Sequence, residues 1–395
     1  MSRGALGDPP VLEWSTRFSS GGFLSTNESG VGPAATGIGG KGDERMRNIR
    51  LIDMGKVSAL QSHTIYHALS HGTRLNQPDT ILLSVPAERY VSLGLYQEFA
   101  KDTDPEYCRA HNIPVFRRQI GGRAHLLDSG QQVFQTVFHW QRAAVSATRM
   151  CQEILRVAVD TYNAFGVDAH YLPSNEINVR KSRISTGAIG RLGDAVVLAC
   201  SLVYDSDTEL ERRALGMASH AATTSMAREL GAPPDRDAVK QTLLSYFERD
   251  LKATLVPGSL NEQELAEVER LEKLFSSQEW IERVVRRRRS VREHDGGEEG
   301  ARIAEGHHLT SEGIQIRATI RTVRGKVDDL VLSGDFLFYR DHFSELEASF
   351  RGAKAEWDAL MTVAENFYLY HQVDSPGVSP ADWVSAIDDA LSNVR

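Results

Sequence analysis

The sequence predicts an α/β (α+β) protein in which a larger unit built on a mixed sheet precedes a smaller C-terminal α+β unit. Short apolar runs that suit buried strands alternate with stretches of helical period between residues 49 and 166. A second series of strands followed by helices begins near residue 309. With 395 residues, of which 41% are hydrophobic and 25% charged, the chain is long enough for two globular domains.

The larger unit opens with a predicted strand, Ile49–Ile52, and a helix in which apolar residues recur at helical spacing through Leu69. Further strands are expected at 80–86, 90–96, 114–118 and 132–140, with helices at 105–112 and 147–166. Gly166 is expected to end the helix that begins at residue 147, because glycine readily adopts the left-handed conformation of a C-terminal cap. A hairpin-like pair of strands is then predicted around 175–186 and 193–205, followed by helical periodicity from 207 to about 290.

The predicted domain organisation has four parts. Residues 1–45 are rich in Gly, Ser, Pro and Thr and are expected to form a disordered tail. A catalytic-type domain is expected at 46–285, a charged, solvated linker at 286–308, and an accessory domain at 309–395. In the last part, strands at 314–323 and 326–338 meet at an Arg324-Gly325 turn, and helices are expected at 341–350, 355–370 and 380–392.

The composition excludes several classes of function. A net charge of −8 and a pI near 5.9 predict no general attraction for nucleic acid, and the arginine cluster near 283–292 lacks interleaved aromatic residues. No apolar run approaches the roughly 20 residues of a membrane helix, and no secretory signal is recognisable at the N-terminus. Three scattered cysteines predict no disulfide framework, so the cytoplasm is the expected compartment.

Four ordered segments carry a resemblance to a known family. They are RRQIGGRAHLLDSGQQVFQTVFH (117–139), NEINVRKSRISTGAIGRLGDAVV (175–197), IQIRATIRTVRGKVDDLVLSGDFLF (314–338) and DSPGVSPADWVSAI (374–387). Together they resemble the lipoate–protein ligases, in which a biotin/lipoate-ligase-like catalytic domain is fused to an accessory domain. The resemblance implies that ATP activates lipoate as lipoyl-AMP, and that a lysine of a lipoyl carrier domain then accepts the acyl group.

The glycine-rich loop of the first segment is the first candidate site. Gly121 and Gly122 have no Cβ, so their backbone can approach anionic oxygens, although a plain turn between strands would have the same sequence. Arg117 and Arg118 end an apolar strand, and alternation sends them to opposite faces. The resemblance implies that Arg118 contacts phosphate or acyl-adenylate, whereas Arg117 is expected to make a surface or structural ion pair.

The second segment supplies candidate polar ligands. By resemblance, Asn175 hydrogen-bonds the nucleotide and Glu176 holds Mg²⁺ between phosphates, since hard cations prefer oxygen ligands. The family has Asp at the second of these positions, so Glu176 adds one methylene. An exposed turn before a strand remains the alternative interpretation of this pair.

Two arginines depart from the family pattern. Arg183 stands where the ligases have a lysine that contacts the reacting carboxylate and α-phosphate, so charge is retained but geometry changes. Lys181, two residues earlier, could replace it through a slip in register. Arg123 replaces the third glycine of the loop, where it either narrows the acyl tunnel or adds a phosphate-binding cation.

Three functions therefore remain open. The first is an ATP-dependent lipoate–protein ligase; the second, motivated by Arg183 and Arg123, is an impaired relative that binds lipoate or a lipoyl carrier. The expected acyl partner is lipoate or octanoate. The third is an ATP-independent carrier-to-carrier transferase, against which the accessory unit argues. Cys151 is interpreted as inert packing, His125 and His139 as ordinary polar residues, and Gly334-Asp335-Phe336 as architectural.

Overall fold

The computed structural model describes residues 46–143, 146–173, 175–216, 222–293, 300–338 and 342–393. The predicted tail at 1–45 lies outside these residues. Residues 46–395 form one compact unit. No helix within the described part of the chain is both long and apolar enough to cross a bilayer.

A six-stranded mixed sheet is the centre of the larger part. Its strands follow the order β10-β11-β6-β2-β1-β12. The pairs β1–β2 and β1–β12 are parallel, whereas β2–β6, β6–β11 and β11–β10 are antiparallel. The strand bounds are β1 Arg47–Val57, β2 Asp79–Pro86, β6 Gln131–His139, β10 Ala188–Leu192, β11 Ala195–Val203 and β12 Ala253–Pro257.

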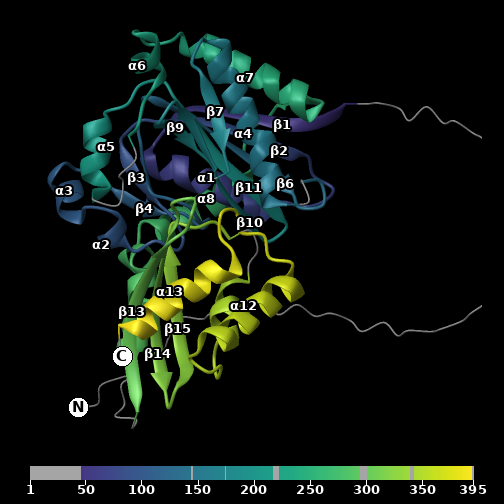
Figure 1. The fold of residues 1–395 in the computed structure, drawn as a ribbon. Helices are drawn as coiled ribbons and strands as arrows, with labels where there is room; N and C mark the ends of the chain where they lie inside the picture. Colours follow the sequence, from purple (N-terminus) through teal and green to yellow (C-terminus); the bar gives the residue numbers. More distant parts are fainter. Residues whose placement is uncertain are drawn as a thin grey trace, which may run out of the picture. The chain divides into compact units, whose positions relative to one another are not determined.

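Helices cover both faces of this sheet (Figure 1). Alternation along β2 sends Ile81 and Leu83 to the face covered by α4 and α7, and Leu82 to the face covered by α1 and α8. Because both faces are buried, β2 and β11 carry long apolar runs, whereas β1 and β6 also hold polar residues. The helices of this part are α1 Ala59–Gly72, α2 Phe99–Asp102, α3 Pro105–Ala110, α4 Ala147–Ala164, α5 Thr208–Ala214, α6 Met226–Leu230, α7 Arg236–Leu251, α8 Glu262–Phe275, α9 Gln278–Ile281 and α10 Arg283–Glu293.

Two small sheets complete the larger part. One has the order β4-β3-β5, with β3 Tyr90–Leu93, β4 Val115–Arg117 and β5 His125–Leu127. The other has the order β7-β8-β9, with β7 Ala169–Leu172, β8 Glu176–Val179 and β9 Ser182–Thr186. The predicted motifs at 117–128 and 175–186 therefore lie on or beside the small sheets rather than in the central one.

The C-terminal part has its own sheet and hydrophobic core. Strands β13 Ala301–Leu309, β14 Gln315–Val323 and β15 Lys326–Gly334 form an antiparallel sheet. Helices α11 Phe343–Ser349, α12 Trp357–His371 and α13 Pro380–Ser392 follow (Figure 1). Trp383 of α13 is fully buried in this core, and a Cβ at Gly306 would lie only 2.1 Å from the backbone of α13, so the helix packs directly on β13.

The mixed-sheet α/β prediction is confirmed, and most predicted elements are present within one or two residues. Gly166 does adopt a positive φ of 86° after α4, and Arg324 and Gly325 have the positive φ angles of a two-residue hairpin turn. The predicted strand pair at 175–186 and 193–205 is wrong. Residues 176–186 form their own hairpin, β8–β9, whereas 195–203 pairs with β10 and β6.

The segment 286–308 is not a solvated linker. Its described residues include most of α10 and all but the last residue of β13, and Arg288 is buried against Glu98, Glu305 and Thr319. Partners distant in sequence therefore convert an exposed-looking charged run into packed structure. The domain boundaries drawn around this segment remain predictions.

Candidate active site

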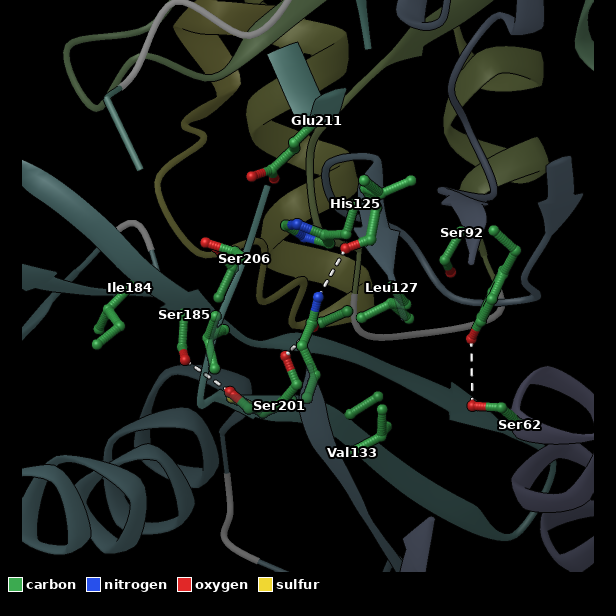
Figure 2. Close-up of a pocket in the computed structure, with 18 of the residues that line it drawn as sticks. Ser62, Ser92, His125, Leu127, Val133, Ile184, Ser185, Ser201, Ser206 and Glu211 are labelled. Carbon is green, nitrogen blue, oxygen red and sulfur yellow. Dashed lines mark hydrogen bonds between the residues drawn. The ribbon is translucent and has the colours of Figure 1, made fainter. Parts of the chain in front are cut away.

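A cavity that opens to solvent lies between the central sheet, α1 and the two small sheets (Figure 2). Its lining comes from segments distant in the sequence. The lining includes Ser62, His63, Tyr66, Tyr90, Ser92, Arg118, His125, Gln131, Val133, Gln135, Arg183, Ser185, Thr186, Cys200, Ser201, Ser206 and Glu211. Both predicted motifs contribute residues to the cavity, Arg118 from the first and Arg183 from the second.

Strand alternation explains which residues reach the cavity. Tyr90 and Ser92 of β3 line it, whereas Val91 and Leu93 point into a separate apolar cluster. On β6, Val133 and Gln135 line the cavity while Phe134 packs against α7 on the opposite face. Val91, Leu93 and Phe134 are therefore core residues, whereas Val133 lines the cavity.

Arg183 on β9 is the central cation of the cavity. Its side chain is 3% exposed, and its terminal nitrogens lie 3.5 Å from Glu176 and 3.8 Å from Glu211. Neither terminal nitrogen has a hydrogen-bond partner among the described residues. Burial raises the pKa of Glu211, with Arg183 opposing the shift. The site thus holds a buried guanidinium with unused donors facing a space for a ligand.

Lys181 does not share this position. It is exposed in the turn between β8 and β9, after Arg180 with a φ of 54°, and it does not line the cavity. The expected strand alternation fails here because the hairpin turns at residues 180 and 181. Of the two cations considered at the reacting group, the structure brings Arg183 to the cavity.

Arg118 lines the cavity but its donors are already used. The guanidinium donates to the carbonyl of Ser92 at 2.9 Å, to that of Gly121 at 2.8 Å and to that of Arg123 at 2.8 Å. Burial lowers the pKa of Arg118 to about 10, so the group remains charged near neutrality. Arg118 therefore shapes the glycine loop and adds positive potential to the cavity.

Arg117 points the opposite way, as strand alternation predicts, but it makes no surface ion pair. Its side chain is fully buried and donates to carbonyls of Gly94, Leu95, Gln97, Trp280 and Ile281. Its role is to join the loop after β3 to α9.

The glycine loop faces the C-terminal part rather than the cavity. The amide of Gly122 donates to the carbonyl of Phe336 at 2.8 Å, and a Cβ on Gly121 would lie 2.5 Å from that same carbonyl oxygen. Arg123 forms an ion pair with Asp335 at 3.0 Å. The glycines are needed for close approach, but the groups that approach in this structure belong to the Gly334-Asp335-Phe336 segment.

Asn175 and Glu176 occupy different environments. Asn175 is buried with a φ of 62°, and its amide oxygen accepts a hydrogen bond from Tyr171, while its side-chain nitrogen lacks a partner among the described residues. Glu176 lies 3.6 Å from Arg123 and 3.5 Å from Arg183. A carboxylate between two guanidinium groups does not fit a Mg²⁺ site, because both positive charges oppose a divalent cation. We derive no step through that ion.

Besides the two terminal nitrogens of Arg183, five buried polar atoms around the cavity have no hydrogen-bond partner within the described ranges. They are His63 Nε2, His125 Nε2, Gln135 Oε1, Thr186 Oγ1 and Ser206 Oγ. Burial lowers the pKa of His63 to about 3 and that of His125 well below its usual value, so both rings are neutral. Such atoms favour a bound ligand or water that offers hydrogen bonds.

The cysteines are poor candidates for thiolate chemistry. Cys108, Cys151 and Cys200 are all free and buried. Burial raises the pKa of Cys108 to about 11 and that of Cys200 to about 12, and it raises the pKa of Cys151 further. The interpretation of Cys151 as inert packing agrees with its complete burial.

Comparison with known families gives a match for this part of the chain. The model of the lipoyl protein ligase A/B catalytic domain matches residues 59–248, which include the cavity and both motifs. Residues 59–248 belong to the lipoyl protein ligase A/B catalytic domain family. The resemblance to lipoate–protein ligases is therefore confirmed, with the segments at 117–139 and 175–197 inside the matched residues, and the relatives include ligases and an acyltransferase.

Curated relatives include both kinds of enzyme. The chain is 25% identical over 272 residues to the octanoyltransferase LipM of Kyrpidia tusciae, covering 60% of this chain and 98% of the relative. It is 22% identical over 314 residues to lipoate–protein ligase 1 of Staphylococcus aureus, covering 75% of this chain and 91% of the relative. Because relatives of both kinds match at this level, the comparison does not distinguish the two reactions.

Solved structures support the same fold. A bipartite lipoate–protein ligase of Thermoplasma acidophilum, described with its E2 lipoyl domain, superposes with a TM-score of 0.54 and 17% identity, over 60% of this chain and 96% of that one. A lipoate–protein ligase A bound with ATP also gives 0.54 at 17% identity, over 60% and 98%. LipL1 of P. falciparum in complex with lipoate gives 0.60 at 12% identity, over 81% and 94%.

Sequence reasoning missed the α1 and α5 contributions to the ligase-family cavity. Ser62 and His63 lie on a helix that is buried on nearly all sides, and Glu211 lies in a region that shows only charged helical periodicity. One signal was available on β6, where polar residues such as Gln131 and Gln135 recur in a strand whose apolar residues predict burial.

Proposed function

We propose that the chain is an ATP-dependent lipoate–protein ligase, which activates lipoate as lipoyl-AMP and transfers the acyl group to a lysine of a lipoyl carrier domain. One observation carries the proposal. Arg183 is a buried cation whose terminal nitrogens have no hydrogen-bond partner among the described residues, in the cavity of a lipoyl-ligase-type domain. Such donors suit the carboxylate of an acid and the α-phosphate that it attacks.

Two displacements make up the proposed reaction. A carboxylate oxygen of lipoate attacks the α-phosphorus of ATP, the bond to the β-phosphate oxygen breaks, and pyrophosphate leaves. The carrier amine then attacks the acyl carbonyl, loses a proton, and AMP leaves. Arg183 would stabilise negative charge that builds up on the transferring phosphate, and the charge of Arg118 adds to it.

Similarity to related proteins supports the parts of the proposal that concern the nucleotide and the carrier domain. An ATP-bound ligase and a ligase described with its E2 lipoyl domain share this fold, and a curated ligase covers 75% of the chain. Three free, buried thiols agree with a reducing compartment such as the cytoplasm. Gly121, Gly122, Arg123 and Asn175 are retained as proposed nucleotide contacts, available once the Phe336 segment moves away from the loop.

An impaired relative that binds lipoate, octanoate or a carrier is the second candidate. The contact between Gly122 and Phe336 favours it, because a loop amide that is already bonded cannot bind phosphate. A carrier-to-carrier transferase has the octanoyltransferase relative in its favour, but no described cysteine is exposed enough to act as a thiolate.

The direct test combines the full chain with lipoate, magnesium ATP and a purified lipoyl domain, and follows carrier mass and lipoyl-AMP. We expect both products, with Arg183→Ala reducing adenylate formation at least 100-fold. Lys181→Ala is the matched control, because Lys181 is exposed in the adjoining turn and should leave the rate unchanged.

Two results would overturn the ligase proposal. Absence of lipoyl-AMP and of modified carrier at enzyme concentrations equal to the carrier would leave the binding function. Transfer from an octanoylated carrier in the absence of nucleotide would instead establish the transferase.

A further inference from the structure

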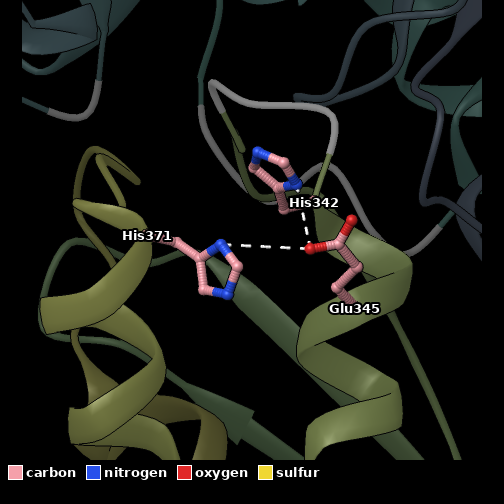
Figure 3. A group of neighbouring side chains, drawn as sticks. All are labelled: His342, Glu345 and His371. Atoms are coloured by element: carbon pink, nitrogen blue, oxygen red, sulfur yellow. Dashed lines mark ion pairs between the residues drawn. The ribbon is translucent and has the colours of Figure 1, made fainter. Parts of the chain in front are cut away.

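A cluster of three side chains in the C-terminal part lies outside the ligase-family cavity. His342 stands immediately before α11, Glu345 lies on its first turn, and His371 is the last residue of α12 (Figure 3). One ligand atom from each residue lies within 4.8 Å of the other two. Nothing in the proposed ligase reaction uses these groups.

The three groups converge on one carboxylate oxygen. Oε2 of Glu345 is 3.0 Å from Nδ1 of His342 and 3.9 Å from Nδ1 of His371. The His342 and His371 rings lie 5.1 Å apart, centroid to centroid. Figure 3 shows both imidazole rings next to the Glu345 carboxylate. Ligand atoms of a four-coordinate zinc ion are separated by roughly 3.3 Å, given bond lengths of about 2.0 Å. Small side-chain rotations would therefore place all three ligands around one ion.

The backbone that carries the ligands is held in place by buried neighbours. Phe343 follows His342 and packs against Tyr96, Phe336 and Phe338. The ring of Phe367, one turn before His371, stacks on the imidazole at 4.2 Å. The ligands are thus fixed at the ends of two packed helices, which lowers the entropy cost of binding an ion.

The surroundings leave the ligands accessible. The side chains of His342, Glu345 and His371 are 38%, 54% and 24% exposed. An ion can enter from solvent, and three protein ligands leave one position for water in a tetrahedral site.

We propose that His342, Glu345 and His371 bind a divalent first-row transition-metal ion of the zinc class, linking the start of α11 to the end of α12. Two imidazole nitrogens with one carboxylate suit this class, whereas Mg²⁺ and Ca²⁺ prefer oxygen ligands throughout. The bound ion stabilises the C-terminal part and takes no part in acyl chemistry.

The test measures Zn²⁺ binding to the full chain by titration calorimetry after treatment with a chelator. We expect one ion per chain, and at least a tenfold weaker affinity in His342→Ala, Glu345→Gln and His371→Ala. His307→Ala is the matched control, because His307 is an exposed histidine of the same part that pairs only with Asp389 in the described contacts. A Co²⁺ titration that produces the visible absorption of a four-coordinate site would support the same assignment.

Thermal unfolding supplies a second readout. Zn²⁺ should raise the melting temperature of the wild type and of His307→Ala, and should leave that of His371→Ala unchanged. Zn²⁺ binding that is equally strong in all three ligand variants, or weaker than millimolar in the wild type, would overturn the proposal. We expect His371→Ala to ligate lipoate with magnesium ATP at the rate of the wild type. Loss of the metal site can then be distinguished from failure of the proposed ligase function.

Discussion

Arg183 lies between two carboxylates, so its chemistry depends on geometry as well as on charge. A guanidinium can contact Glu176, Glu211 and a ligand oxygen at once, whereas an ammonium presents a compact charge on a more flexible stem. If the arginine is a working replacement for the family's lysine, its surroundings are adapted to the planar fork.

We therefore expect Arg183→Lys to reduce adenylate formation by at least tenfold while the chain stays folded. Pyrophosphate release measures the first step, and circular dichroism checks the fold. Lys181→Arg is the control for a second cation on the same hairpin. An increase in rate for Arg183→Lys would instead mark the arginine as a product of functional decay.

A substitution of Gln135 can test whether the polar lining of the cavity weakens the binding of purely aliphatic acids. Its Oε1 atom is buried without a partner among the described residues, and an unsatisfied buried acceptor costs about 1–3 kcal/mol. We expect Gln135→Leu to bind octanoate about tenfold more tightly than the wild type, measured by calorimetry. Gln141→Leu, at an exposed position beyond the end of the same strand, should have no effect. Weaker octanoate binding in Gln135→Leu would refute this prediction.

Because His63 is buried, we expect the folded chain to lose stability in acid. Burial lowers its pKa to about 3, while an unfolded chain has the ordinary value near 6.5. Between these values only the unfolded state binds the proton, so stability falls as pH falls, by up to about 1.4 kcal/mol per pH unit.

Urea unfolding at pH 6 and pH 4.5 measures this effect. We expect His63→Gln to lose about 1 kcal/mol less per pH unit than the wild type, although His67 and His125, whose pKa values are also lowered, retain part of the slope. His307→Gln, with an 85% exposed side chain, should behave as the wild type. Identical slopes in wild type and His63→Gln would show that His63 is already accessible to protons.

At the scale of elements, Arg117 connects β4 to α9 and to the loop after β3. Removing its side chain takes a donor from five backbone carbonyls, of which those of Gly94, Gln97 and Ile281 are in buried hydrogen bonds, and hydrogen bonds to charged groups are worth about 1.5–3 kcal/mol each. We expect Arg117→Ala to lower the free energy of unfolding by about 3–5 kcal/mol. Arg289→Ala, at an exposed position on α10, should change it by less than about 0.5 kcal/mol. A comparable loss in both variants would contradict this role.

The elements also show what the sequence can and cannot predict. Period and composition identified β2, α4 and the β14–β15 hairpin because their patterns are local. The short edge strand β12 was missed because its pairing with β1 depends on residues about 200 positions away. The helix α10 appeared to be a linker because its partners, such as Glu98 and Glu347, are likewise distant.

The candidate site likewise contains some residues that the sequence could identify and others that it could not. Arg183 and Arg118 were identified from motifs, and both reach the cavity. Lys181 was expected on a strand because a two-residue turn is difficult to place within a polar run. The partners of Gly122 and Arg123 could not be predicted, since they come from Phe336 and Asp335 in another part of the chain.

At the scale of the whole molecule, Asp335 helps to hold the C-terminal part against the glycine loop. It pairs with Arg123 at 3.0 Å, while burial raises the pKa of its carboxyl group. We expect Asp335→Ala to speed amide hydrogen exchange in residues 120–124 about tenfold, because the loop opens more often. Asp358→Ala, an exposed acid of the same part, should leave that exchange unchanged. Unaltered protection in Asp335→Ala would mean that the backbone bond between Gly122 and Phe336 suffices.

The bond from the Gly122 amide to the Phe336 carbonyl has a thermodynamic consequence in both directions. A phosphate that takes this amide competes with the C-terminal strand end for one donor, so each weakens the other by the same factor. If the chain binds a nucleotide at this loop, as proposed, then nucleotide affinity and attachment of the C-terminal part are reciprocal quantities. A carrier domain that favours the detached arrangement would tighten nucleotide binding without touching the nucleotide.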